Sequence, residues 1–266
     1  MEIPLFQVDA FAERPFEGNP AAVCLLQRWL PDATMQAIAA ENALSETAFV
    51  LTTRHPFELR WFTPGAEVEL CGHATLASAF IVMDEQTEGD DDVVFASASG
   101  LLPVRRRGPD LTLDFPSRPV VEADLDPELD TILAGNDGPR AVARLHNQRS
   151  EFVVYENQAD LAALAPDFRA LLRRDRPYVI ATAPGDEHDF VSRFFAPGVG
   201  VDEDPVTGSA HTSLAPYWAT RLGRTQLRAR QISKRGGELR CEVVGERVLI
   251  TGRCVTFSRG QCVVPN

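Results

Sequence analysis

The sequence lacks the short motifs that identify the commonest nucleotide-binding and catalytic folds. It contains no GxGxxG dinucleotide fingerprint, no phosphate-binding P-loop, no HExxH zinc motif and no GxSxG nucleophile elbow. Its five histidines, at positions 55, 73, 146, 188 and 211, show no spacing typical of metal ligands. We therefore expect a protein that uses no cofactor and no metal.

Cysteine and long apolar runs are also scarce. The five cysteines, at positions 24, 71, 241, 254 and 262, are odd in number and form no CxxC pair, which argues against a disulfide framework or a structural zinc site. Reduced thiols are the default in the cytoplasm. The first residues lack the basic flank and apolar run of a signal peptide, and no segment has 18 consecutive apolar residues. We expect a cytoplasmic protein with no membrane partner.

Acidic residues outnumber basic residues in this sequence. The 266 residues carry a formal net charge of −12, so the field of the whole molecule should repel nucleic acid. A small anionic substrate remains compatible with this charge, because the N-terminus of a single helix can bind an anion inside an acidic protein.

What the sequence does contain is an internal repeat. Residues 60–65 read RWFTPG, and residues 193–198 read RFFAPG, 133 positions later. CGHAT at residues 71–75 corresponds in the same way to TGSA at residues 207–210. Two copies of more than 100 residues exclude a short-period solenoid and indicate two domains. We place them at residues 1–117 and 118–266, and the extreme C-terminus could pack back on the first.

The hydrophobic pattern of each half predicts several strands and one helix that is apolar on every side. The helices are expected near residues 74–83 and 209–220, and a linker rich in proline and acids near residues 116–127. The predicted fold class is α+β, with two domains related by a pseudo-twofold axis. Each domain is a barrel-like, mostly antiparallel sheet around a central helix, and a cleft lies between the domains.

Glycines stand at the starts of both predicted buried helices, at Gly72 and Gly208. A helix start exposes unpaired N–H groups and the positive end of the helix dipole, and glycine lets a ligand approach the backbone closely. Two such ends would clamp a carboxylate. The alternative is that both glycines only form loops and helix caps.

Glu46 is the first candidate for chemistry. It lies where a helical pattern gives way to an apolar strand, so burial could raise its pKa towards the range useful for proton transfer. The equivalent region of the second half, residues 177–183, contains no acid. A single acid in a symmetric cleft favours one carboxyl group that both removes and returns a proton; the alternative is a solvated residue at a strand edge.

Three further residues have two interpretations each. His73 could share the proton transfer, because imidazole titrates near neutrality, or could only hydrogen-bond to backbone at a helix start. Asp204 could orient this histidine or cap its own loop. Cys71 could be a thiolate favoured by the adjacent helix start, but its counterpart in the repeat is Thr207, which disfavours a racemase with two thiols.

Several segments that span most of the chain resemble the PhzF family of phenazine-biosynthesis isomerase-like proteins, whose fold is related to diaminopimelate epimerase. They are FQVDAF at residues 6–11, FEGNPAAV at 16–23, LSETAF at 44–49, RWFTP at 60–64, LCGHAT at 70–75 and EDPVTGSA at 203–210.

The resemblance implies cofactor-free proton transfer on a small carboxylate, commonly in a homodimer. It assigns the proton-shuttling acid to Glu46, and other polar positions of the site to His73, Asp204 and Ser209. Gly72 and Gly208 match the loops that hold substrate, and we also expect Asn19 and Cys71 to contact it. Two alternatives remain open: a racemase or epimerase in which Cys71 or His73 is a second proton carrier, and a non-catalytic metabolite-binding or interaction protein.

Overall fold

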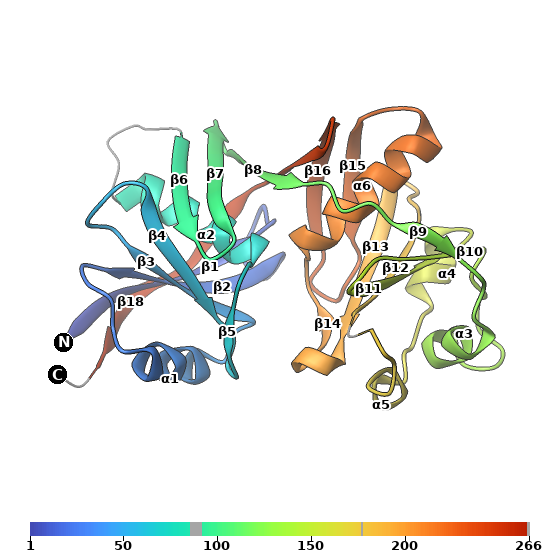
Figure 1. Cartoon of the computed structure of the whole chain (residues 1–266), viewed down its shortest axis with the longest axis horizontal. Helices are drawn as coiled ribbons and strands as arrows, with labels where there is room; N and C mark the ends of the chain where they lie inside the picture. The colour runs from blue at the N-terminus through green and yellow to red at the C-terminus, as the bar shows by residue number, and fades with distance from the viewer. Residues whose placement is uncertain (86–91, 177, 265–266) are drawn as a thin grey trace. The chain divides into compact units, whose positions relative to one another are not determined.

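The chain divides into two compact units (Figure 1). The computed structural model describes residues 1–85, 92–176 and 178–264. The first unit comprises residues 1–115 together with 249–266, and the second comprises residues 116–248. The boundary expected after residue 117 lies two residues beyond this division, and the C-terminal residues return to the first unit.

The first unit is a mainly antiparallel sheet around one buried helix. Its elements are β1 (Glu2–Ala10), β2 (Asn19–Leu26), α1 (Asp32–Asn42), β3 (Glu46–Leu51), β4 (Phe57–Phe62), β5 (Glu67–Val68), α2 (Gly72–Glu85), β6 (Asp92–Ser97), β7 (Gly100–Arg107), β8 (Asp110–Pro116) and β18 (Cys254–Val263). Strand β1 pairs antiparallel with β2 and β18, and β2 runs parallel to β3. Strand β4 is antiparallel to β3 and β5 but parallel to β6.

The second unit repeats this pairing pattern. Its elements are β9 (Val121–Ala123), α3 (Pro127–Ala134), β10 (Ala143–His146), β11 (Ser150–Val154), α4 (Gln158–Ala162), α5 (Phe168–Leu171), β12 (Tyr178–Pro184), β13 (Phe190–Ala196), a 3₁₀ turn (Pro197–Val199), β14 (Val201–Asp204), α6 (Gly208–Leu222), β15 (Gln226–Gln231) and β16 (Gly237–Val244); β17 (Arg247–Gly252) crosses the division between the units. Strand β10 pairs with β9 and β11, and β11 runs parallel to β12. Strand β13 is antiparallel to β12 and β14 but parallel to β15. The duplication seen in the sequence is therefore a duplication of topology.

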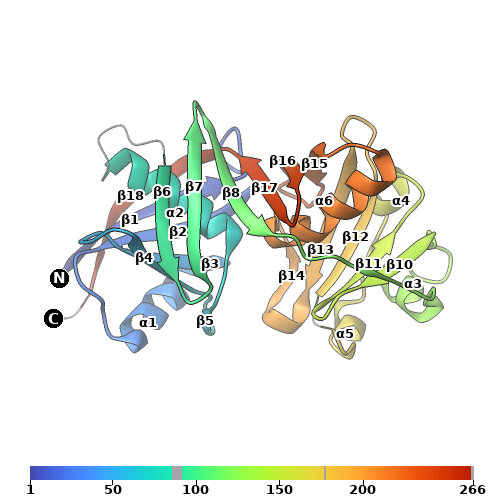
Figure 2. The same cartoon turned by 45° about the horizontal axis from the view of Figure 1, so that its top comes forward.

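Helix α2 is buried on nearly all sides, as its run of small apolar residues predicts. Strands β1, β2, β3, β6 and β18 all contact it. Figures 1 and 2 show the helix enclosed by strands of its own unit. The small side chains of the helix let the strands approach closely, which fixes the position of its first turn.

Helix α6 is the counterpart of α2 and contains a proline, Pro216. Proline has no N–H, so the carbonyl four residues earlier, on Thr212, loses its helical partner. The backbone N–H of Arg118 supplies it with a hydrogen bond of 3.0 Å, and the Ser213 hydroxyl donates to the Arg118 carbonyl at 2.6 Å. The segment after β8 therefore completes this helix.

The α+β class predicted from the sequence is confirmed, with two differences in detail. Part of the expected linker, at Val121–Ala123, is strand β9. Helix α3 was not predicted, although its start carries a clear signal: Asp126 caps it by accepting from the backbone of Leu129 at 3.0 Å, and Pro127 occupies its first turn.

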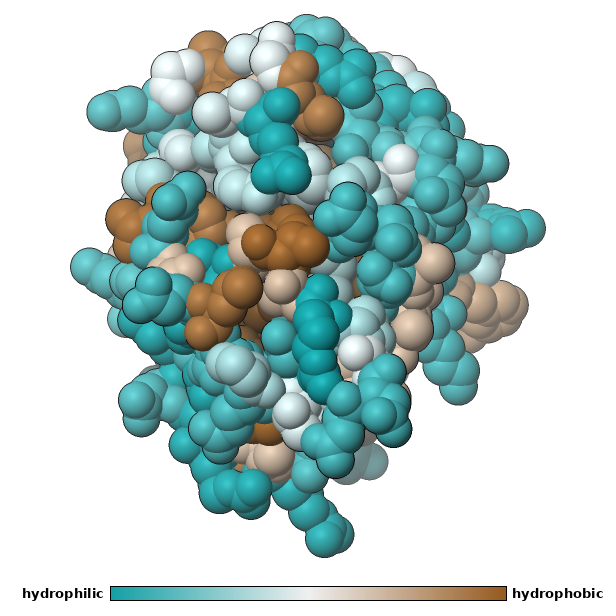
Figure 3. All heavy atoms as spheres, turned by 90° about the vertical axis from the view of Figure 1, so that its right-hand side faces the viewer, coloured by the Kyte–Doolittle hydropathy of each residue, from teal (hydrophilic) through white to brown (hydrophobic). Residues whose placement is uncertain are grey.

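The surface is predominantly polar on the face drawn in Figure 3, where small brown groups interrupt a mostly teal surface. Among the described residues, no helix combines the length and the apolar character needed to cross a membrane.

Candidate active site

Glu46 is the first residue of β3, directly after the turn that follows α1. The helix ends because Ala43 adopts a left-handed conformation with φ of 51°, while its N–H still bonds to the Ala39 carbonyl at 3.2 Å. The Asn42 amide donates to the Thr47 hydroxyl at 3.0 Å, which fixes the chain on both sides of the turn. The Glu46 side chain is 18% exposed.

Cys71 and His73 lie at the start of α2. Cys71 immediately precedes the helix, and its sulfur accepts a hydrogen bond from the backbone N–H of Ala74. Its carbonyl also accepts from the Thr75 backbone N–H at 3.1 Å. His73 lies in the first helical turn and is buried, with a side chain 6% exposed.

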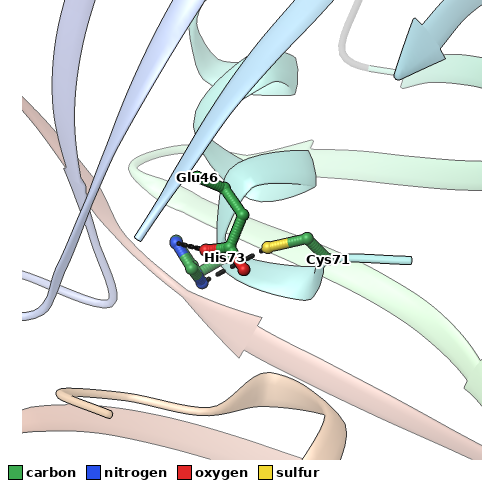
Figure 4. Close-up of side chains that lie close together, drawn as sticks. All are labelled: Glu46, Cys71 and His73. Atoms are coloured by element: carbon green, nitrogen blue, oxygen red, sulfur yellow. Dashed lines mark hydrogen bonds and ion pairs between the residues drawn. The ribbon is translucent and has the colours of Figure 1, made fainter. Parts of the chain in front are cut away.

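These side chains converge on the imidazole of His73 (Figure 4). Its Nε2 lies 3.2 Å from Oε2 of Glu46, and its Nδ1 lies 3.5 Å from Sγ of Cys71 and 3.2 Å from Nδ2 of Asn19. Asn19 is the first residue of β2 and is fully buried. Four of the residues predicted from the sequence are thus in contact within the first unit.

The charge of His73 follows from its neighbours. Burial by itself lowers the pKa of an imidazole, but here Cys71 and Glu46 outweigh burial and raise the pKa of His73 well above its ordinary value of 6.5. Burial, followed by the nearby Glu46 carboxylate, raises the pKa of the Cys71 thiol to about 11. A thiol with that pKa is neutral at pH 7, so Glu46 is the charge that favours a protonated His73.

In the second unit, a hydrogen-bonded loop precedes α6. The Thr207 hydroxyl donates to a carboxylate oxygen of Asp204 within this loop. Gln231, on β15, accepts from the Thr207 backbone N–H at 2.9 Å and donates to the Asp204 carbonyl at 2.6 Å. Because Gln231 is fully buried, it holds the loop rigidly against the sheet.

Gly208 and Ser209 begin α6, directly after this loop. Gly208 is buried, and Ser209 is partly exposed. Two residues after Ser209, the Nδ1–H of His211 donates to the Thr207 carbonyl at 2.9 Å. Burial lowers the pKa of His211 to about 4, so this histidine is neutral at pH 7.

The two units share the helix start but not the ionisable side chains around it. Strand β12 begins with Tyr178 where the equivalent β3 begins with Glu46, and no acid lies in residues 178–183. Pro177, the first position of the region compared in the sequence, lies outside the described residues. Position 73 is histidine and position 209 is serine. The contact between a carboxylate at a strand start and a histidine at a helix start therefore has no counterpart at the equivalent described positions of the second unit.

Sequence reasoning missed Gln231 and the role of Thr207 in holding the second helix start. Gln231 lies 24 residues after Thr207, in a strand whose alternation of buried and exposed residues is ordinary. Its only signal was that a polar residue occupies a position that faces the core. Such a residue indicates a structural role, because a buried amide needs hydrogen-bond partners.

Solved structures of low identity share this fold. A predicted epimerase from Pseudomonas aeruginosa aligns with a TM-score of 0.72 at 20% identity, covering 99% of this chain and 100% of that one. A probable proline racemase from Agrobacterium radiobacter aligns with a TM-score of 0.63 at 15% identity, covering 99% and 93%. The chain therefore has the epimerase-like α+β fold expected from its sequence.

Closer relatives define the family. A PhzF-family protein from Enterococcus faecalis has a TM-score of 0.95 and 44% identity over 99% of this chain and 100% of that one. An "Uncharacterized isomerase" of Pseudomonas aeruginosa is 50% identical over 98% of both chains, and a human "Phenazine biosynthesis-like domain-containing protein" is 40% identical over 90% of this chain and 91% of its own. The model of the phenazine biosynthesis-like (PhzC-PhzF) family matches residues 8–260. This chain belongs to the PhzF family, and relatives that carry the name isomerase support an isomerase function.

Proposed function

We propose that this protein is a cofactor-independent isomerase that moves a proton on a small carboxylate-bearing metabolite, with Glu46 as the general acid/base. The supporting observation is the contact of 3.2 Å between the Glu46 carboxylate and the buried imidazole of His73. A protonated imidazole stabilises the carboxylate before the reaction and can share the proton that Glu46 accepts. The side-chain amide of Asn19 lies 3.2 Å from Nδ1 of the ring, and it can hold the protonated ring with its oxygen turned towards the Nδ1–H.

The substrate carboxylate is proposed to bind at the starts of α2 and α6. Both helices begin with a buried glycine, Gly72 and Gly208, where free N–H groups and the helix dipole favour an anion. Asp204 and Gln231 keep the second helix start rigid, and Ser209 offers a hydroxyl in its first turn. An interdomain position for the substrate, expected from the sequence, is part of this proposal.

A racemase with Cys71 as a second proton carrier has less support. Such a carrier must form a thiolate, but burial raises the pKa of Cys71 to about 11. The sulfur also accepts a hydrogen bond from the helix backbone, as a helix cap does. The geometry therefore favours a single carboxyl carrier.

The test compares Glu46→Gln with the wild-type protein. Each is incubated with a bacterial metabolite extract in H₂O and in D₂O, and chromatography with mass spectrometry detects products with the mass of their substrates. We expect Glu46→Gln to lower turnover by about 10²–10⁴-fold, the usual contribution of positioned proton transfer, with substrate binding retained. Glu41→Gln, the same change at an exposed position in α1, is the matched control.

The deuterium label separates the candidate functions. Partial retention of the original hydrogen supports one carrier, whereas complete uptake of solvent deuterium supports a racemase with two carriers. Binding of a metabolite without conversion would indicate a non-catalytic protein. Full activity in Glu46→Gln would remove this residue from the mechanism. The homodimer that the resemblance implies is tested by light scattering during gel filtration.

A further inference from the structure

The cluster at the start of α2 has the composition of a metal site. Glu46, Cys71 and His73 each offer one ligand atom, an oxygen, a sulfur and a nitrogen, and these atoms all lie within 4.8 Å of one another. Once metal binding has displaced the protons of the thiol and the imidazole, the set offers a thiolate, a neutral imidazole and a carboxylate, which are the three ligand types that Zn²⁺ uses in proteins. Mg²⁺ and Ca²⁺ prefer oxygen ligands alone.

The distances suit a four-coordinate ion. Bond lengths of about 2.3 Å to sulfur and about 2.1 Å to nitrogen or oxygen place tetrahedral ligand atoms about 3.4–3.6 Å apart. The contacts of 3.2 Å between Glu46 and His73, and of 3.5 Å between Cys71 and His73, are already close to this spacing. The two contacts use different ring nitrogens, so the side chains must rotate to direct all three groups at one ion.

The burial of the cluster points in the same direction. Oε2 of Glu46 and Nε2 of His73 are buried atoms that pair with each other at 3.2 Å. A bound ion would replace this direct pair with a bond to each side chain. His73 and Cys71 lie at the start of α2, and the Glu46 side chain is 18% exposed. Two of the three ligand groups are therefore positioned by one helix start.

We propose that Glu46, Cys71 and His73 form a Zn²⁺-binding site, with the fourth position open to water or to an anionic ligand. Three protein ligands and one open position are typical of zinc sites that exchange ligands. One consequence rests on the proposed function: a bound zinc ion occupies the carboxylate of Glu46, so zinc and proton transfer exclude each other. The binding itself is measured without reference to activity.

The test uses Co²⁺ as a spectroscopic substitute for Zn²⁺. The purified chain is freed of metal with a chelator and titrated with Co²⁺, and the thiolate-to-cobalt charge-transfer band and the d–d bands are recorded. We expect one equivalent of tetrahedral Co²⁺ with a thiolate ligand, which stoichiometric Zn²⁺ displaces and excess Mg²⁺ does not. Glu46→Gln and Cys71→Ser should each weaken Zn²⁺ binding by at least about tenfold in a competition assay with a chromophoric chelator.

Controls distinguish this site from binding at other thiols. Cys262→Ser removes a partly exposed cysteine on β18 and should leave the titration unchanged. Circular dichroism checks that each variant is folded. A charge-transfer band that persists in Cys71→Ser, an octahedral spectrum without a thiolate ligand in the wild type, or equal Zn²⁺ affinity of the wild type and Glu46→Gln would overturn the proposal. Zinc binding can fail while the isomerase stands, and the reverse also holds.

Discussion

Gln231 should be the residue on which the loop before α6 depends most. Its side chain is fully buried and makes three hydrogen bonds: from the Thr207 N–H at 2.9 Å, to the Asp204 carbonyl at 2.6 Å and to the Thr207 hydroxyl at 3.2 Å. Leucine has a similar volume but no polar atoms. The change Gln231→Leu therefore removes all three bonds without creating a large cavity.

The cost follows from the groups left behind. The Thr207 N–H loses its partner at a buried position, and an unsatisfied buried group costs about 1–3 kcal/mol. Gln231→Leu should therefore lower the free energy of unfolding by about 1–3 kcal/mol. For a protein of this size, even the lower value corresponds to a decrease in Tm of about 2 °C or more.

Urea denaturation followed by tryptophan fluorescence and far-UV circular dichroism measures this loss. Gln226→Leu is the matched control, because Gln226 is exposed on the same strand, and it should change stability by less than about 0.5 kcal/mol. Gln231→Glu should also be destabilising, since a carboxylate accepts from Thr207 but cannot donate to the Asp204 carbonyl. Wild-type stability in Gln231→Leu would refute the role assigned to this residue.

Three further predictions concern His211, Gly18 and Cys262. Burial lowers the pKa of His211 to about 4, so between pH 6.5 and pH 4 the unfolded state binds a proton that the folded state does not. About 2 kcal/mol of stability should therefore be lost between pH 7 and pH 5. Urea titrations at these two pH values measure the loss, which should be smaller in His211→Gln. Gly18 has φ of +64°, and an added Cβ would overlap a backbone oxygen of β1. Gly18→Ala should therefore lower the free energy of unfolding by more than about 2 kcal/mol, as measured by thermal denaturation. Gly65→Ala, with open space around the added Cβ, should lower it little. A hydrogen bond from the Cys24 thiol lowers the pKa of the partly exposed Cys262 to about 7, so mass spectrometry after brief alkylation at pH 7.5 should find Cys262 modified before the buried cysteines.

Much of the fold could be predicted because its signals are local. The apolar runs that form α2 and α6 sit directly after glycines, and the second half repeats the first in sequence as in strand pairing. Helix α3 was missed even though its cap, Asp126 followed by Pro127, is also local. That signal was assigned to the linker because prolines and acids fill both kinds of segment.

The sequence named the residues of the cluster around His73 but not their contacts. The sequence and its resemblance to the PhzF family pointed to Glu46, Cys71, His73 and Asn19, which are separated by up to 54 residues along the chain. Their convergence on one imidazole depends on the parallel pairing of β2 with β3 and on the packing of α2 against both.

The sequence by itself determined the duplication, the two buried helices and the identity of the ionisable groups, because periodicity and residue type are properties of short segments. Only the tertiary structure decided how those groups behave. His73 and His211 are both buried near the starts of equivalent helices. The neighbouring Cys71 and Glu46 raise the pKa of His73, whereas burial lowers the pKa of His211. Charge at a buried site depends on distances between residues far apart in the chain, and those distances exist only after the sheet has closed around each helix.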